Sequence, residues 1–104
     1  MMRFSDFHGI PNPAAAHAGP LAVGVAAATL ASLVTLDAAT EFVLIRVETQ
    51  ALRLTVNGTT PTATLGFNYA VDSEILLSRA EADVAKLIRS GGADSAIQVA
   101  QFKS

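Results

Sequence analysis

The segment FVLIRVETQALRLTVNGTTPTATLGF, residues 42–67, decides the fold class of this chain. Apolar and polar side chains alternate along it, which is typical of half-buried β-strands. In its first part the alternate positions Val43, Ile45 and Val47 are apolar and β-branched, and the alternation resumes over residues 52–56. The pattern predicts two strands that each turn one face toward a core.

A turn signal follows the second of these strands. Asn57-Gly58 tolerates positive φ at both positions and is the strongest short-range signal for a β-hairpin. Ala63, Leu65 and Phe67 then re-enter the same alternation. We therefore expect antiparallel strands joined by a tight turn.

Length and composition predict one small domain. A chain of 104 residues supports a single core with little room for a buried cleft. It has no cysteine, which excludes disulfides, cysteine-based zinc sites and thiol chemistry. Small secreted domains are often held together by disulfides, so this absence favours a protein made in the cytosol or stabilised by an assembly.

The charge pattern argues against nucleic acid and membranes as partners. The formal net charge is −2, both signs are interspersed, and Lys and Arg do not cluster. Within the quoted segment, Arg46 and Arg53 are predicted to face outward on successive strands and to lie opposite Glu48. A cross-strand ion pair of this kind contributes about 0.2–1 kcal/mol, so we interpret these charges as structural.

Residues 1–30 are predicted to form an extended N-terminal arm. Three prolines remove backbone donors and push the preceding residues toward extended geometry. Two interpretations remain open: a disordered terminus, or an arm that becomes ordered across a neighbouring subunit. In the second case the partner-binding anchors are the large apolar side chains of the arm, which are Phe4, Phe7 and Ile10.

Residues 21–36 carry no charge and must be tested as a membrane or export signal. A spanning helix needs about 20 apolar residues, and this run is shorter. Export with cleavage near Ala38-Ala39 remains an alternative. We prefer an interpretation in which part of the run forms the first strand, with Leu33 and either Val34 or Leu36 packed inward.

Ser78 and Glu81 have the spacing of a capping box, which predicts that a helix begins there. Two interpretations of residues 79–90 remain open. One is a long helix that ends at the following Gly-Gly pair. The other is a single helical turn over residues 79–84 followed by a strand over residues 86–90. We prefer the second, because a sandwich needs another strand to cover its core.

The complete pattern predicts an all-β fold. A turn over residues 68–73, a short strand at 74–77 and a closing strand at 95–102, with Ile97 and Val99 inward, accompany the elements above. We expect a jelly-roll-like antiparallel sandwich of about six to eight short strands with one helical turn, spanning residues 31–104.

The sequence offers no catalytic constellation. Both histidines, His8 and His17, fall in the predicted arm, which cannot hold metal ligands in a fixed orientation on its own. No nucleophile elbow and no glycine-rich phosphate loop is present. The acidic residues that are close in sequence lack an acid–base partner and are interpreted as solvated turn and helix-start charges: Asp72 with Glu74, and Glu81 with Asp83. We therefore predict no enzyme activity, no catalytic residue, no cofactor and no metal.

The strand–turn–strand segment resembles a group of small tailed-phage virion proteins. The resemblance is carried by residues 42–49 and 52–66 and continues through residues 74–89 and 97–102. Its most specific part is Asn57-Gly58-Thr59-Thr60-Pro61-Thr62. A similar run with Asp at the first position occurs in immunoglobulin-like appendage domains of glycosidases, where it also forms a turn, and Asn suits a turn equally well.

This resemblance implies an antiparallel sandwich without catalysis, located on a capsid or a tail. The function that we expect from it is that of a capsid decoration (cement) protein, made in the host cytoplasm and bound to the major capsid protein on the outer surface of the virion. Closed symmetry favours a homo-oligomer, and a capsid three-fold axis would make it a trimer. One alternative is a carbohydrate- or receptor-binding module of a tail fibre or exported protein, with Phe67, Tyr69 and Phe102 as the candidate aromatic residues. The other is a small exported protein without its leader.

Overall fold

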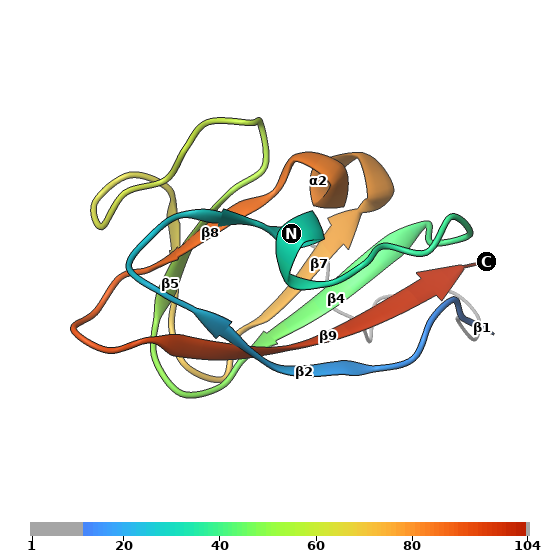
Figure 1. The fold of residues 1–104 in the computed structure, drawn as a ribbon, viewed down its shortest axis with the longest axis horizontal. Helices are drawn as coiled ribbons and strands as arrows, with labels where there is room; N and C mark the ends of the chain where they lie inside the picture. Colours follow the sequence, from blue (N-terminus) through green and yellow to red (C-terminus); the bar gives the residue numbers. More distant parts are fainter. Residues whose placement is uncertain (1–11, 104) are drawn as a thin grey trace.

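The computed structural model describes residues 12–103, which form two antiparallel β-sheets around a common core (Figure 1). Sheet A contains, in order, β1 (Asn12–Pro13), β9 (Ser95–Lys103), β4 (Phe42–Val47) and β7 (Glu74–Ser78), and β2 (Ala18–Val23) also pairs with β9. Sheet B contains, in order, β3 (Ala28–Thr29), β8 (Lys86–Arg89), β5 (Leu52–Thr55) and β6 (Phe67–Tyr69). Two short helices, α1 (Leu30–Leu33) and α2 (Arg79–Val84), lie against each other. The predicted all-β sandwich is confirmed, with nine strands in the described part of the chain.

The core lies between the sheets and is built from alternate residues of their strands. In β4, Val43, Ile45 and Val47 are fully buried, whereas Arg46 between them is exposed. The same alternation buries Ile97 and Val99 of β9, so the predicted inward faces of both strands are confirmed. Burial of such a side chain contributes roughly 1.5–3 kcal/mol. The other apolar core residues are Val23, Leu30, Leu52, Leu54, Ile75, Leu77, Ala82, Ala85 and Leu87.

β4 and β5 are consecutive in sequence but lie in different sheets. β4 pairs with β7 and β9, whereas β5 pairs with β6 and β8. The predicted arrangement of Arg46 and Arg53 opposite Glu48 is therefore wrong. Arg46 instead forms an ion pair with Asp72 (3.3 Å), and Glu48 accepts a hydrogen bond from Gln98 (2.9 Å).

Residues 12–30 belong to the sandwich, so the predicted domain boundary at residue 30 is wrong for this part of the chain. β2 pairs with β9 and β3 pairs with β8, and Val23 and Leu30 are fully buried. Proline is tolerated in β1 and β2 because each has only one neighbouring strand among the described residues, so the missing donor need not cost a ladder hydrogen bond. Outside the described residues lie the predicted anchors Phe4, Phe7 and Ile10, and also His8.

Part of the run 21–36 was expected to form the first strand, and residues 21–23 and 28–29 do lie in β2 and β3. The part around Leu33, which was expected to pack inward from a strand, forms α1 and an irregular segment instead. The Thr29 hydroxyl accepts a hydrogen bond from the Ser32 amide (3.2 Å) and caps the N-terminus of this helix. Leu33, Val34 and Leu36 are partly buried and pack against the core, as their apolar character predicts. Neither helix of residues 12–103 has the length and apolar character to cross a membrane.

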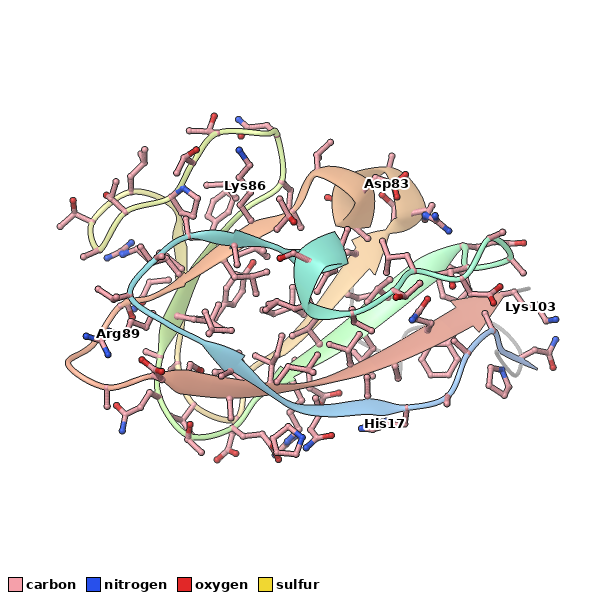
Figure 2. The ribbon with its side chains drawn as sticks, viewed as in Figure 1. His17, Asp83, Lys86, Arg89 and Lys103 are labelled. Carbon is pink, nitrogen blue, oxygen red and sulfur yellow. The ribbon has the colours of Figure 1, made fainter. Side chains whose placement is uncertain are left out.

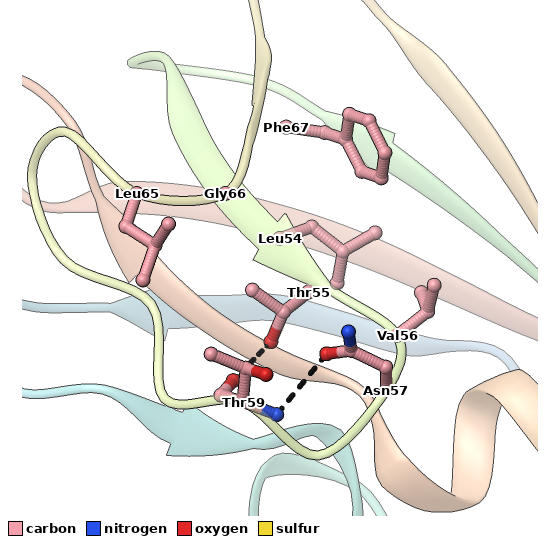
Figure 3. A pocket seen from close by; sticks show the side chains of 8 residues that line it. All are labelled: Leu54, Thr55, Val56, Asn57, Thr59, Leu65, Gly66 and Phe67. Atoms are coloured by element: carbon pink, nitrogen blue, oxygen red, sulfur yellow. Dashed lines mark hydrogen bonds between the residues drawn. The ribbon is translucent and has the colours of Figure 1, made fainter.

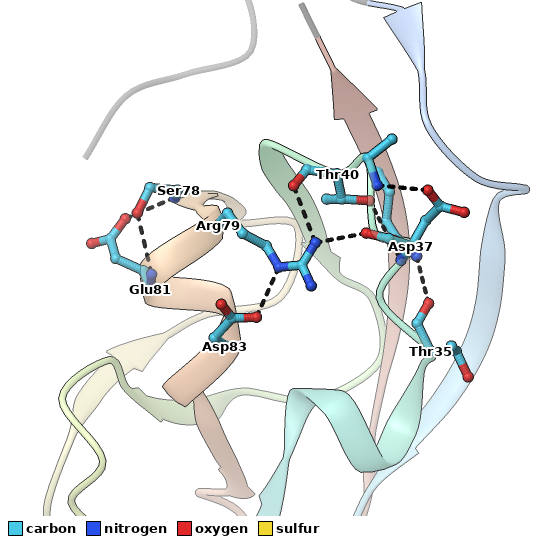
Figure 4. A network of polar contacts seen from close by, with 9 residues as sticks. Thr35, Asp37, Thr40, Ser78, Arg79, Glu81 and Asp83 are labelled. Carbon is cyan, nitrogen blue, oxygen red and sulfur yellow. Dashed lines mark hydrogen bonds and ion pairs between the residues drawn. The ribbon is translucent and has the colours of Figure 1, made fainter.

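The region after β7 confirms the interpretation with the shorter helix. The Ser78 hydroxyl accepts a hydrogen bond from the Glu81 amide (3.2 Å), and the Glu81 carboxylate accepts one from the Ser78 amide (2.9 Å), as a capping box requires (Figure 4). α2 ends at Val84, and β8 then fills the position between β3 and β5. Pairing on both sides of β8 outweighs the helical periodicity of its sequence.

A polar network connects the segment before β4 to the end of β9 and to α2 (Figure 4). The buried Gln101 side chain accepts hydrogen bonds from the Thr40 hydroxyl (2.6 Å) and the Asp37 amide (2.9 Å) and donates one to the Thr35 carbonyl (3.0 Å). Arg79 donates to the carbonyls of Asp37 (2.6 Å) and Thr40 (3.2 Å). The polar groups of this region therefore stabilise the fold.

Candidate functional site

The candidate site is a surface hollow of about 390 Å³ where the end of β5 meets the start of β6 (Figure 3). β5 and β6 pair through Leu52 opposite Tyr69 and Leu54 opposite Phe67, and residues 56–66 form the loop between them. The side chains and backbone that line the hollow are those of Leu54, Thr55, Val56, Asn57, Thr59, Leu65, Gly66 and Phe67.

The loop replaces the tight hairpin predicted at Asn57-Gly58. The local turn chemistry is present, because Gly58 has a φ of 84° and the Asn57 side-chain oxygen accepts a hydrogen bond from the Thr59 amide (3.2 Å). The chain does not pair again directly after this turn. The Thr62 hydroxyl accepts from the Leu65 amide (2.9 Å), which adds a second turn before β6 begins.

Arg53 fixes the far side of this loop. Its Nε donates to the Ala63 carbonyl and its Nη1 donates to the Gly66 carbonyl, both at 2.8 Å. Near the base of the loop, the Thr55 hydroxyl donates a short hydrogen bond to the Thr59 carbonyl. Because side chains of β5 hold the loop at both places, the walls of the hollow are preorganised.

The apolar lining of the hollow is unusually exposed. Leu65 is 50% exposed and Phe67 is 64% exposed, although both lie at apolar positions of the predicted alternation. Phe67 does share a sheet face with Leu54, its cross-strand partner, which is 1% exposed. β6 is the last strand of sheet B in the described chain, so Phe67 lies beyond the covered centre of the core.

The polar groups at the hollow are neutral. None of the eight lining residues has an ionisable side chain. Among the described residues, the Asn57 side-chain nitrogen and the Thr59 hydroxyl have no hydrogen-bond partner, so both could bind a ligand group. The hollow can therefore provide apolar contact and a few hydrogen bonds, but no acid–base or nucleophilic group.

The candidate acid–base and metal-binding residues His17, Asp72 and Asp83 make contacts outside the hollow, and His17 and Asp83 lie far apart in Figure 2. His17 Nε2 lies 2.7 Å from Gln98 Oε1. Asp72 pairs with Arg46, and Asp83 pairs with Arg79 (2.8 Å), so neither belongs to a carboxylate pair that could act as acid and base. Residues 12–103 contain no group of three potential metal ligands.

Among the described residues, Tyr69 is the one whose pKa departs clearly from its ordinary value. Burial raises the pKa of its phenol, and the nearby negative charge of Glu81 raises it further. Tyr69 packs against the core, and Phe102 is partly buried with its ring 6.4 Å from that of Phe42. Of the three aromatic residues proposed for sugar binding, Phe67 alone is largely exposed.

The hollow was not predicted from the sequence. The available signal was the threonine- and proline-containing run between two apolar alternations, which is too long for a two-residue turn. No protein-family model, curated protein or solved structure matches the chain.

Proposed function

We propose that this protein is a non-enzymatic structural protein of a phage virion, a capsid decoration (cement) protein that binds the major capsid protein on the outer surface and stabilises the shell. The observation that carries the proposal is the exposed apolar pair Leu65 and Phe67 beside a preorganised hollow without ionisable groups. Exposed aromatic residues next to a pocket are typical anchors of protein–protein interfaces.

The scaffold suits this role. The sandwich presents the hollow from β5 and β6, and Arg53 holds the intervening loop through two hydrogen bonds to its carbonyls. A rigid contact surface loses little conformational entropy when it binds, which favours attachment in many identical copies. The charges of the chain are interspersed and sum to −2, so we expect apolar contact to be the main attraction between this protein and the capsid.

The arm and the oligomeric state complete the proposal. Phe4, Phe7 and Ile10 are proposed to anchor the chain to a neighbouring subunit, and the protein is proposed to act as a homotrimer at a capsid three-fold axis. Replacing Phe4 and Phe7 together by Ala should weaken attachment while leaving the melting temperature of the free protein unchanged. An equal loss of both properties would contradict the anchoring role.

The test uses capsids purified from a phage that lacks the gene for this chain. Wild-type protein should bind them in many copies per particle, and Phe67→Ala should weaken binding about tenfold or more, as expected for an aromatic anchor. Val25→Ala is the matched control, because Val25 is 71% exposed but lies outside the hollow. Failure of the wild type to bind would overturn the proposal, and a low copy number would place the protein at a tail or neck.

One observation favours carbohydrate or receptor binding as a second candidate. Phe67 is an exposed ring in the same hollow as the Asn57 amide and the Thr59 hydroxyl, and this combination of groups suits a sugar. A glycan array probed with wild-type protein tests this function. Binding that is lost in Phe67→Ala and in Asn57→Ala would support it, and an array without signal would exclude the glycans displayed.

A further inference from the structure

β7 forms an edge of sheet A that is neither very short nor interrupted by a proline or a register shift. Among the described strands with only one neighbour, β1 and β3 have two residues each and β6 has three. β2 contains Pro20, and its register shifts between Ala18 and Leu21. Such devices keep other chains from adding to a sheet edge. β7 has five residues with regular register and no proline.

The hydrogen bonds at the two ends of β7 show which of its backbone groups face away from β4. The Val47 amide donates to the Ser73 carbonyl (3.0 Å) at one end, and the Arg79 amide donates to the Glu41 carbonyl (2.8 Å) at the other. Hydrogen-bonded pairs alternate along an antiparallel ladder. The odd-numbered residues of β7 therefore bond to β4, and the even-numbered residues direct their N–H and C=O groups outward.

One of these outward groups already has a partner. The Ser78 amide donates to the Glu81 carboxylate (2.9 Å), which agrees with the alternation. The backbone groups of Glu74 and Leu76 have no partner among the described residues. An antiparallel strand could exchange two backbone hydrogen bonds with each of these two residues.

We propose that the free edge at Glu74–Leu76 accepts an extended, basic segment of another polypeptide by β-augmentation. This inference rests on the proposed function, under which the segment belongs to the major capsid protein. The residue of this segment that lies opposite Leu76 is apolar, because Leu76 is itself apolar and partly buried. Its residue opposite Glu74, two positions further along, is Lys or Arg.

The charge of the edge selects a basic segment over a second copy of this chain. Glu74 is exposed near one end of β7, and the Glu81 carboxylate lies at the other end, on the Ser78 amide. The nearby cations are already paired, since Arg46, opposite Glu74 on β4, binds Asp72, and Arg79 binds Asp83. The charge left along the edge is therefore negative. Two copies paired through β7 would bring these carboxylates together along one ladder, and like charges across a sheet are destabilising. A cationic side chain complements them instead.

The test compares edge variants in binding to capsids that lack the chain. Leu76→Pro removes an outward N–H without removing a hydrogen bond to β4, and Leu76→Lys places a positive charge on the edge. Each variant should weaken binding by about tenfold, because it removes or disturbs a backbone hydrogen bond to the bound segment. Leu44→Lys is the matched control, because Leu44 projects from the same face but on the central strand β4, and it should bind within about threefold of the wild type.

The outcomes separate this inference from the proposed function. If the wild type does not bind capsids, both fail. If the wild type binds and Leu76→Lys binds equally well, the edge is not the site although the proposed function stands. An equal loss in Leu44→Lys would place the contact on the sheet face. If Leu76→Pro lowers the melting temperature strongly, the binding of Leu76→Lys alone tests the role of the edge.

Two further readouts test the nature of the partner. Bound protein should show slower hydrogen exchange at the Glu74 and Leu76 amides, and Glu74→Gln should reduce the dependence of binding on salt. Unchanged exchange at these amides would overturn the inference. A dimer in sedimentation analysis that Leu76→Pro abolishes would identify a second copy as the occupant and would also overturn it.

Discussion

The Thr40 hydroxyl donates a hydrogen bond of 2.6 Å to the side-chain oxygen of Gln101, and both residues are buried. This contact joins the segment before β4 to the last strand, β9, across sixty-one positions of sequence. The same oxygen accepts the Asp37 amide, and the Gln101 nitrogen donates to the Thr35 carbonyl. One amide side chain therefore satisfies three polar groups of the irregular segment before β4.

Replacing Gln101 by Ala should be strongly destabilising. The change removes the partner of a buried hydroxyl and of two backbone groups, so the free energy of unfolding should fall by about 2–4 kcal/mol. Urea unfolding measures this loss. Gln98→Ala is the matched control on the same strand, since Gln98 is only partly buried and bonds to His17 and Glu48. A larger loss in the control would contradict the assigned role of Gln101.

Gly66→Ala should destabilise the loop that carries the hollow. Gly66 has a φ of +121°, and an added Cβ would lie 3.2 Å from the Leu54 carbonyl oxygen. Because both the conformation and the space disfavour a side chain, we expect a loss of about 1–3 kcal/mol in the free energy of unfolding, together with weaker ligand binding at the hollow. Gly92→Ala, where an added Cβ meets no atom within 4 Å, should have little effect on unfolding. Equal effects of the two changes would contradict this account.

The sequence correctly predicted the elements in which the local pattern of residues favours the same secondary structure as the tertiary contacts do. The alternation of Val43, Ile45 and Val47 marks β4 because one face is buried, and the spacing of Ser78 and Glu81 places the start of α2. The preference for a strand at residues 86–90 was confirmed because a second sheet needs β8 between two neighbours.

The remainder depends on contacts that periodicity does not encode. Alternation shows that β4 and β5 each bury one face, but it does not show that they belong to different sheets. β2 lies in an alanine- and proline-rich segment whose composition does not favour a strand. Its strand conformation is stabilised by pairing with β9. The loop at the hollow is held by Arg53 through the carbonyls of Ala63 and Gly66, and the alternation of apolar residues does not reveal such side-chain contacts.

Ser78→Ala should cost about 1 kcal/mol in the free energy of unfolding, because the Glu81 amide loses its capping partner. Ser78→Thr keeps a hydroxyl at the cap and should remain close to the wild type. Thermal or urea unfolding of the three proteins provides the measurement. A loss in Ser78→Thr as large as that in Ser78→Ala would mean that shape at this position, and not the hydrogen bond, stabilises the start of α2.

The stability of the protein should decline at alkaline pH through Tyr69. Its pKa in the folded state is raised above the ordinary value of 10.0, by burial first and by the charge of Glu81 second. The folded state therefore holds the phenolic proton more tightly than the unfolded state does. The resulting stabilisation is complete below the ordinary pKa and is lost as the pH rises through the raised one. Urea unfolding at increasing pH should show this decline, and Tyr69→Phe should reduce it.

Glu81→Gln separates the two causes of this shift. The glutamine side chain can still accept the Ser78 amide, so the capping box is retained while the negative charge is removed. Tyr69 is the only tyrosine in the chain, so the ultraviolet absorbance of its phenolate reports its pKa directly. The pKa should move toward the ordinary value in Glu81→Gln but stay above it, because burial is the larger cause. An unchanged pKa would exclude Glu81 as a cause, and a complete return to the ordinary value would contradict the larger contribution of burial.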